Sequence, residues 1–181
     1  MKKNTLQYIL LGLIEQKGMS GYDLKEVFKN EIGEFWQAEH SQIYPTLKKL
    51  EEKGWISSTI TIVGTKLEKK VYSITPLGKE QVNDWLFNQP NELASFKDEF
   101  ILKLYFIKEN DQQAIQDILT EQQRLHRLKL EHLYARREVI FPEKKALNGD
   151  IGHYLILDHA INREQCTLTW IERTLASLPL E

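Results

Sequence analysis

The chain has 181 residues, of which 41% are hydrophobic and 28% charged, and its formal net charge is −2 at pH 7. Such a length can bury one core or two small ones, and such a composition is typical of a globular protein, which excludes a disordered or fibrous chain. The near-neutral charge gives no general case for nucleic acid binding, so that case depends on where the charges lie.

The beginning of the chain predicts a cytoplasmic protein without a leader or a membrane span. The first apolar run, residues 6–14, is interrupted by Gln7 and Gly12, and no cleavage site of small residues follows it. No later segment has the roughly 18 consecutive apolar residues of a membrane helix. The single cysteine, Cys166, cannot form an intrachain disulfide.

Three helices are predicted in the first part of the chain. The first extends from a plausible N-cap at Thr5 to Gln16, and the second begins after Ser20-Gly21 and ends at the Gly33 break. The third opens at Ser41, with a proline in or just after its first turn, where proline is tolerated. The predicted inner faces are Leu6, Ile9, Leu10, Leu13 and Ile14 in the first helix and Ile43, Leu47 and Leu50 in the third.

A β-hairpin is predicted after the third helix. Residues 56–62 alternate with period two, with Ile56, Ile60 and Ile62 on one face, and a second strand covers 69–74. Three helices followed by a hairpin with lysines at its tip is the winged-helix plan, in which helix three enters the major groove and the wing contacts flanking phosphates. The candidate DNA-binding residues are Ser41, Gln42, Tyr44, Pro45, Thr46, Lys48, Lys49, Lys66, Lys69 and Lys70.

These candidates also have simpler interpretations. The hairpin lysines could form an ordinary solvated turn, Tyr44 could cover the core, and Gln42 could cap its helix. All twelve cations of residues 1–90 are lysines, against eleven acidic residues, and the first arginine is Arg124. Bidentate contacts from arginine to guanine are therefore unavailable to this half, so base reading depends on Gln42, Ser41, Thr46 or lysine, and we expect an operator that tolerates A·T pairs.

The second half of the chain is predicted to be helical over 97–107, 112–139 and 151–178. The long helices carry apolar seams, of Ile115, Ile118, Leu119, Leu125, Leu128 and Leu133 and of Ile151, Leu155, Ile161, Leu168, Ile171, Leu175 and Leu178. These seams could pack within one chain, but they favour a homodimer, because they leave more apolar surface than one chain covers. The predicted fold is mainly α with a small β-hairpin: a winged helix-turn-helix domain (1–90) and an all-helical dimerisation and effector-sensing domain (91–181).

Several runs of residues are specific when found together. They are 20–24 (SGYDL), 40–47 (HSQIYPTL), 64–70 (GTKLEKK), 72–75 (YSIT), 97–100 (KDEF) and 152–155 (GHYL). Through them nearly the whole chain resembles the PadR-type transcriptional regulators, and in particular the subgroup that represses phenolic acid decarboxylase genes. The resemblance implies a homodimeric repressor in a phenolic acid stress response, which hydroxycinnamic acids such as p-coumarate and ferulate release from a pseudo-palindromic operator.

An aromatic carboxylic acid needs an apolar wall and a few placed polar partners. His40 and His153 lie inside the runs that carry the resemblance, although a lone histidine is more often structural. The ligand carboxylate needs a cation, which Lys97, Arg124, Arg127 or Arg136 could supply. The candidate effector-binding residues are Tyr22, Phe35, Trp36, His40, Lys97 and His153.

Enzymatic functions are not expected. Two histidine pairs are six residues apart, which places their members on different helix faces, so no metal motif results, and no phosphate-binding glycine loop or local nucleophile signature is present. No cofactor is predicted. Two alternatives stay open: a related repressor that senses bulky hydrophobic drugs, which the four tryptophans permit, and a winged-helix protein-interaction module without DNA affinity.

Overall fold

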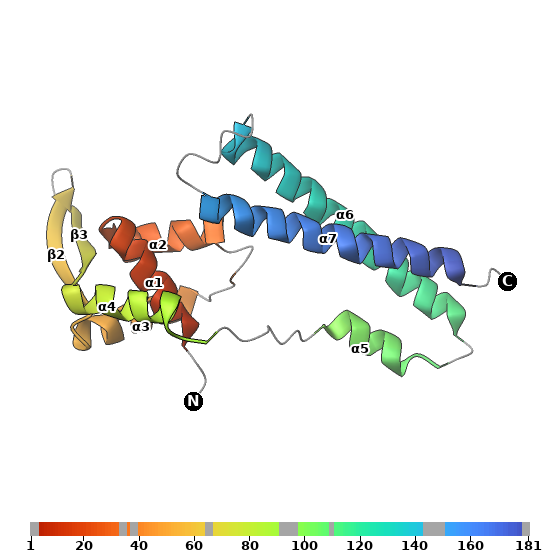
Figure 1. The fold of residues 1–181 in the computed structure, drawn as a ribbon, viewed down its shortest axis with the longest axis horizontal. Coiled ribbons are helices and arrows are strands. Elements are labelled where there is room, and N and C mark those ends of the chain that lie inside the picture. Colours follow the sequence, from red (N-terminus) through yellow and green to blue (C-terminus); the bar gives the residue numbers. More distant parts are fainter. Residues whose placement is uncertain are drawn as a thin grey trace. The chain divides into compact units, whose positions relative to one another are not determined.

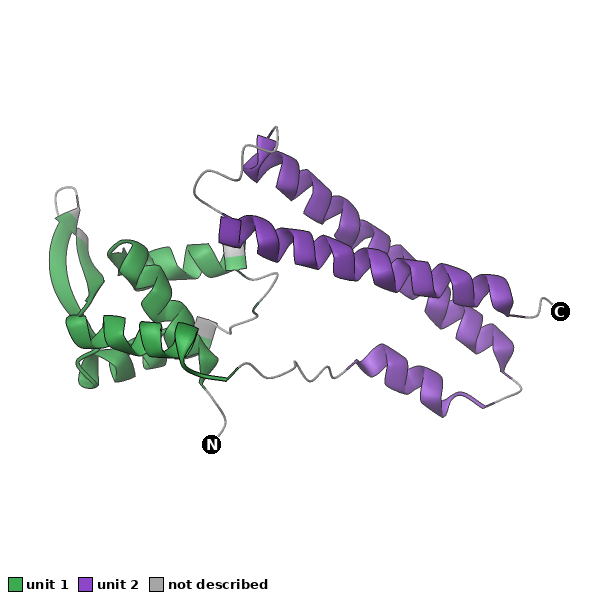
Figure 2. Cartoon of the chain, viewed as in Figure 1, with its two compact units in different colours: residues 1–93 green, residues 94–181 purple. Residues whose placement is uncertain are grey.

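The computed structural model describes residues 4–32, 36, 40–63, 67–90, 98–108, 111–142 and 151–178. The chain divides into two compact units, residues 1–93 and 94–181 (Figures 1 and 2). The division expected from the sequence follows residue 90. Within the part of the chain that the structure describes, no helix combines the length and apolar character needed to cross a membrane.

The first unit contains the three predicted helices. They are α1 (Thr5–Gln16), α2 (Gly21–Val27) with its π-helical continuation η1 (Phe28–Ile32), and α3 (His40–Glu52). The bounds of α1 are confirmed, but the predicted N-cap at Thr5 is wrong, since Asn4 precedes the helix and its side chain makes no capping hydrogen bond. A further helix, α4 (Pro76–Phe87), begins at a proline behind Thr75, whose hydroxyl caps it.

The predicted hairpin is confirmed as β2 (Ile56–Val63) and β3 (Leu67–Ile74). The short strand β1 (Met19–Ser20) was not predicted; it pairs with β3 and makes a three-stranded antiparallel sheet of order β1-β3-β2. Two residues are too few to show an alternating pattern, and the pairing brings distant parts of the chain together. The strand therefore follows from the tertiary fold and not from local sequence.

One apolar cluster forms the interior of the first unit. It includes the predicted inner residues of α3, since Ile43, Leu47 and Leu50 are almost completely buried. The expected face of β2 is only partly buried: Ile56 lies in the core, whereas Ile60 and Ile62 are 67% and 72% exposed. The hairpin thus extends beyond the core. The buried members of the cluster are Leu6, Tyr8, Leu10, Leu11, Leu13, Ile14, Met19, Leu24, Phe28, Ile43, Leu47, Leu50, Ile56, Tyr72 and Val82.

The second unit consists of α5 (Glu99–Phe106), α6 (Gln112–Ile140) and α7 (Ile151–Ser177), close to the predicted helices. The long helices α6 and α7 pack side by side (Figure 1), with Leu119 and Ile171 fully buried where Phe100 of α5 joins them. The predicted seams are only partly closed within the chain. Their exposed members are Leu125, Leu128, Ile151 and Leu155, each between 42% and 56% exposed.

Candidate nucleic-acid interface

Helix α3 presents a polar outer face. Its inner residues fix the helix on the core, and the opposite side chains of Ser41, Gln42, Tyr44, Pro45, Lys48 and Lys49 are exposed. The expectation that Thr46 belongs to this face is wrong. Thr46 is 7% exposed, and its hydroxyl donates a hydrogen bond of 2.7 Å to the backbone carbonyl of Gln42. Threonine in a helix commonly bonds back to the preceding turn, so its donor is already used.

Tyr44 lies on the surface and not over the core. Its ring is packed against the first residue of α2, where a Cβ on Gly21 would lie 2.5 Å from a ring carbon, closer than real Cβ contacts come. Only glycine leaves room for the ring in this position. The side chain remains 55% exposed, which favours the interpretation of Tyr44 as a contact residue.

A groove of about 630 Å³ lies between the helices and the hairpin. Tyr22 lines it and is 63% exposed, so the structure places this tyrosine beside Tyr44 on the outer surface and not in an interior apolar wall for an effector. The groove combines aromatic rings, hydroxyls and cations, which suits a sugar-phosphate backbone better than an apolar ligand. Its lining residues are Ser20, Gly21, Tyr22, Tyr44, Glu68, Lys69, Lys70 and Tyr72.

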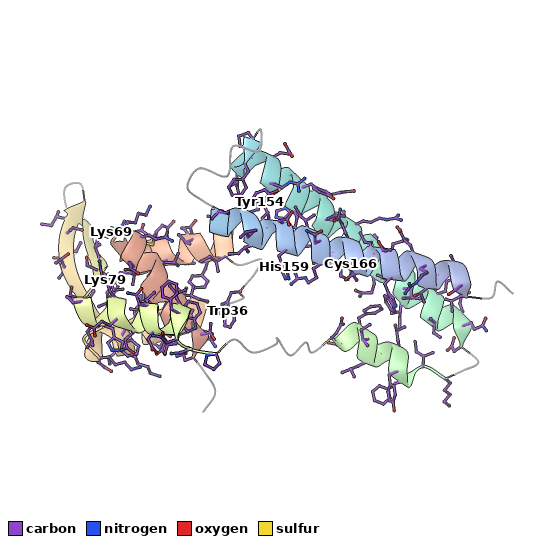
Figure 3. The ribbon with its side chains drawn as sticks, in the orientation of Figure 1. Trp36, Lys69, Lys79, Tyr154, His159 and Cys166 are labelled. Atoms are coloured by element: carbon purple, nitrogen blue, oxygen red, sulfur yellow. The ribbon has the colours of Figure 1, made fainter. Side chains whose placement is uncertain are left out.

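Lys69 of β3, labelled in Figure 3, forms an ion pair with Asp23 of α2. Its ammonium lies 2.9 Å from Asp23, a carboxylate that also accepts hydrogen bonds from the backbone and hydroxyl of Ser20 in a capping box. Partial burial opposes ionisation of Asp23, but the hydrogen bonds from Lys69 and Ser20 outweigh it and lower the pKa of Asp23 from 3.8 to about 2. Asp23 is therefore charged throughout the physiological range.

Lys70 is bound to α3. Its ammonium donates to Glu51 over 2.8 Å, and the same carboxylate accepts the hydroxyl of Ser58 from β2. These two hydrogen bonds lower the pKa of Glu51, and the bond to Glu51 raises the pKa of Lys70. Two of the predicted phosphate-binding lysines are thus already paired with acids of the same unit. The third, Lys66, lies outside the described residues.

The acids Asp23 and Glu51 were missed as functional candidates. The Ser20 to Asp23 spacing is a recognisable capping-box signature and could have been found in the sequence. The pairing of Glu51 could not, because it joins residues 19 positions apart through the fold.

The predicted effector residues are divided between the two units, and some of them lie outside the described residues. Phe35 and Lys97 lie outside the described residues, and His40 begins α3 with a side chain that is also outside them. Trp36 is 40% exposed and belongs to the first unit (Figure 3). His153 belongs to the second unit, on α7, where its ring packs edge-on against Phe141 with centroids 5.4 Å apart.

Two of the arginines considered for the ligand carboxylate are already engaged. Arg124 pairs with Glu121 over 2.7 Å, and Arg127 pairs with Glu172 over 2.8 Å.

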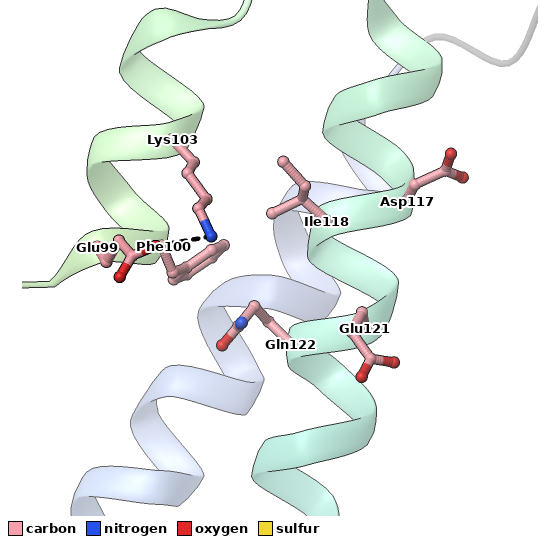
Figure 4. A pocket seen from close by; sticks show the side chains of 7 residues that line it. All are labelled: Glu99, Phe100, Lys103, Asp117, Ile118, Glu121 and Gln122. Carbon is pink, nitrogen blue, oxygen red and sulfur yellow. Dashed lines mark ion pairs between the residues drawn. The ribbon is translucent and has the colours of Figure 1, made fainter.

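A hollow of about 490 Å³ between α5 and α6 is not a plausible alternative site for a carboxylate (Figure 4). Among the described residues that line it, the one cation, Lys103, is paired with Glu99, and Asp117 adds a negative charge that would repel an anion. The predicted cation therefore remains an expectation.

The first unit, with α3 on its surface and the β2–β3 hairpin beside it, is a winged helix-turn-helix domain. Residues 10–84 match the model of the transcriptional regulator PadR-like family, and residues 96–179 match that of the virulence activator alpha C-terminal region. The chain is 42% identical over 177 residues to the negative transcriptional regulator PadR of Bacillus subtilis, covering 96% of this chain and 97% of that protein. It therefore belongs to the PadR-like family of transcriptional regulators, a family of regulators and not of enzymes.

Two solved structures are similar over nearly the whole chain. The crystal structure of Bacillus subtilis PadR in complex with operator DNA matches with a TM-score of 0.91 and 41% identity, covering 98% of this chain and all of that one. The structure of the same protein in complex with p-coumaric acid matches with a TM-score of 0.83 and 40% identity, covering 94% and 96%. The resemblance seen in the sequence is confirmed at the level of the family and the fold.

Proposed function

We propose that this protein is a cytoplasmic transcriptional repressor that binds a pseudo-palindromic operator as a homodimer and is released by hydroxycinnamic acids such as p-coumarate and ferulate. The observation that carries the proposal is the exposed polar face of α3, in a fold that matches the operator complex of a 41% identical protein. A phenolic acid decarboxylase gene is the proposed target. No catalytic step or cofactor is required.

On DNA, α3 is proposed to read bases from the major groove. Ser41 and Gln42 supply hydrogen-bonding groups at its beginning, while Lys48 and Lys49 carry positive charge toward phosphates. Because Thr46 is buried, direct reading rests on fewer side chains than expected from the sequence. With no arginine before Arg124, we expect modest discrimination at guanine and tolerance of A·T pairs.

Dimerisation is proposed to proceed through the second unit. Tyr105 and Phe106 of α5 are 80% and 77% exposed, and further apolar side chains are open on α6 and α7. Exposed apolar surface of this extent marks an interaction site. Binding to two successive major grooves requires such a dimer to hold its two α3 helices about 34 Å apart.

The DNA-binding proposal is tested by selecting duplexes from a random library with the full-length protein. The selected sites should be pseudo-palindromes with half-sites about 10 base pairs apart, and binding should weaken steeply as salt concentration rises. Gln42→Ala should relax the selected sequence at one position per half-site, whereas Lys48→Ala should weaken binding to all sequences alike. Absence of salt-dependent DNA binding would favour the protein-interaction module instead.

Effector release is tested by titrating p-coumarate into the complex with selected DNA and into the free protein. We expect loss of DNA binding with wild type and a weaker response with His153→Ala, because a buried carboxylate or phenol needs its polar partner. Equal p-coumarate affinity of the two proteins would remove His153 from the site. Binding of bulky hydrophobic dyes in place of p-coumarate would support the drug-sensing alternative.

A further inference from the structure

The β2–β3 hairpin is tied to the rest of its unit by two ion pairs on opposite faces. Directly paired residues of an antiparallel ladder share a face, and successive residues alternate. Lys69 stands opposite Thr61 and Lys70 opposite Ile60, so these two lysines lie on different faces of the hairpin. Lys69 reaches Asp23 in α2, and Lys70 reaches Glu51 in α3.

Both acids are held in place by further hydrogen bonds. Ser20 donates to Asp23 from its backbone N–H at 2.9 Å and from its hydroxyl at 2.8 Å, and Ser58 donates its hydroxyl to Glu51. A fixed carboxylate loses little conformational freedom when a lysine binds it, so these pairs are better ordered than ordinary surface pairs.

Apolar packing does not hold the outer part of the hairpin. Ile56 is buried at the base, but Ile60 and Ile62 stand beyond the core and are largely exposed. Lys70 lies opposite Ile60, at the level where burial ends. The ion pairs thus act where the core no longer fixes the angle between hairpin and helices.

We infer that Asp23 and Glu51 are positioning residues, which set the angle of the hairpin to α3 through Lys69 and Lys70 and so place the wing for DNA. The role of the wing on DNA rests on the proposed function. A simpler interpretation treats the lysines as phosphate contacts and the two acids as incidental. The two interpretations predict opposite changes in DNA affinity when one of the acids is removed.

The decisive variant is Glu51→Ala in the full-length protein. If Lys70 mainly contacts phosphate, loss of the acid frees a cation and strengthens DNA binding. If Glu51 positions the wing, DNA binding weakens. We expect a weakening of about two- to fivefold per wing, and about 4- to 25-fold for a dimer with two wings, from the energies typical of partly exposed ion pairs.

Glu52→Ala is the matched control. It removes the same charge from the same end of α3, but Glu52 forms only a 3.9 Å pair with Lys48, with both side chains well exposed. This control should bind DNA as tightly as wild type or more tightly. The inference is wrong if Glu51→Ala also binds at least as tightly as wild type.

A charge swap separates positioning from net charge. Lys70→Glu should weaken DNA binding, and adding Glu51→Lys should recover much of the loss because the pair is restored in reverse. Adding Glu52→Lys to Lys70→Glu restores the same net charge one residue away, and should recover less. Equal recovery by both second substitutions would overturn the inference.

Hydrogen exchange of the β2 and β3 amides gives a readout that needs no DNA. Glu51→Ala should speed exchange across the hairpin pairs from Thr59 to Val63, while Glu52→Ala should not. Unchanged exchange in Glu51→Ala would refute the positioning role even if the wild type bound no DNA. Failure of wild type to bind DNA, with faster exchange in Glu51→Ala, would instead overturn only the proposed function.

Discussion

The two units of this chain differ in how they complete their interiors. In the first unit, the four helices α1 to α4 and the sheet close around one apolar cluster, in which Leu10 and Leu11 of α1 are 0% exposed. In the second, α5 buries Phe100, packs Leu104 partly against the same cluster, and leaves Tyr105 and Phe106 about four-fifths exposed. The first unit therefore has a core of its own, whereas the second presents apolar surface that another surface must cover.

The interiors also differ in polarity. The described interior of the second unit holds Glu164, 5% exposed, which lies on α7 and meets His126 of α6 at 2.5 Å. A buried polar pair specifies how two long helices align, since any other register leaves its members without partners. In the first unit the ion pairs lie at the surface and tie the hairpin, while its described buried polar residues, Ser20 and Thr46, are uncharged.

The largest effect should come from the exposed face of α5. Tyr105→Ser with Phe106→Ser should raise the dimer dissociation constant about 10³-fold, because two copies of each lost ring would otherwise be buried at roughly 1 kcal/mol or more apiece. Sedimentation at several concentrations measures this change, and helix content should stay constant. Phe87→Ser, at the end of α4 and 78% exposed, is the control in the first unit.

If the doubly substituted protein still dimerises, the exposed apolar face of α5 is not the dimer interface, and this difference between the two units is contradicted. Dissociation of the dimer by Phe87→Ser would show that the dimer interface lies in the first unit.

The closed packing of the first unit is tested by Gly78→Ala. A Cβ there would lie 2.1 Å from the carbonyl oxygen of Trp55, a backbone atom that cannot turn aside. We expect a loss of about 3 kcal/mol in the free energy of unfolding. Gly12→Ala in α1 is the control, because nothing lies within 4 Å of its Cβ, and it should gain about 0.5–1 kcal/mol.

Urea unfolding followed by tryptophan fluorescence measures both glycine variants. Trp36, Trp55 and Trp85 belong to the first unit, so a Trp170→Phe background confines the signal to that unit. Equal stability of the two variants would show that the region around Gly78 can relax.

Sequence periodicity predicted α1, α2, α3, α5, α6 and α7 because burial imposes it on such elements, but it gave no prediction of α4 (Pro76–Phe87). The bounds of α1 and the inner residues Ile43, Leu47 and Leu50 of α3 followed from this rule. The prediction from periodicity was wrong where segments distant in the sequence determine which residues are buried. Ile60 continues the alternation of Ile56 but lies beyond the core, and β1 exists only through its partner β3.

The candidate site was predicted less completely, because residue type does not reveal partners. The hairpin lysines were predicted to contact DNA phosphates, but Lys69 and Lys70 are paired with acids from α2 and α3. Thr46 was expected on the outer face, and a bond to the preceding turn uses its hydroxyl. Such pairings depend on the relative placement of elements, which local patterns do not contain.

The polar interior of the second unit is tested by His126→Leu. This change removes the partner of the Glu164 carboxylate on α6 and leaves it paired with Arg163, at 3.3 Å. We expect the free energy of unfolding to fall by about 2 kcal/mol. The double variant His126→Leu with Glu164→Leu should recover at least half of that loss, since an apolar pair needs no hydrogen bond. Thermal unfolding followed by circular dichroism measures the series. An additive second loss would show that Glu164 stabilises through other partners.

The smallest effect concerns the acid that ties the hairpin to α2. Because the pKa of Asp23 is lowered to about 2 from 3.8, its contribution to stability is present above pH 4 and is lost as the pH falls toward 2. The side chain is 36% exposed, so after allowance for solvent screening we expect about 1 kcal/mol. Asp23→Asn removes this titration, so the stability difference between wild type and variant should shrink from pH 6 to pH 2.5 in urea unfolding. A difference that stays constant with pH would mean that Asp23 acts through its hydrogen bonds and not through its charge, and the ion pair to Lys69 would then hold the hairpin less firmly than that of Lys70.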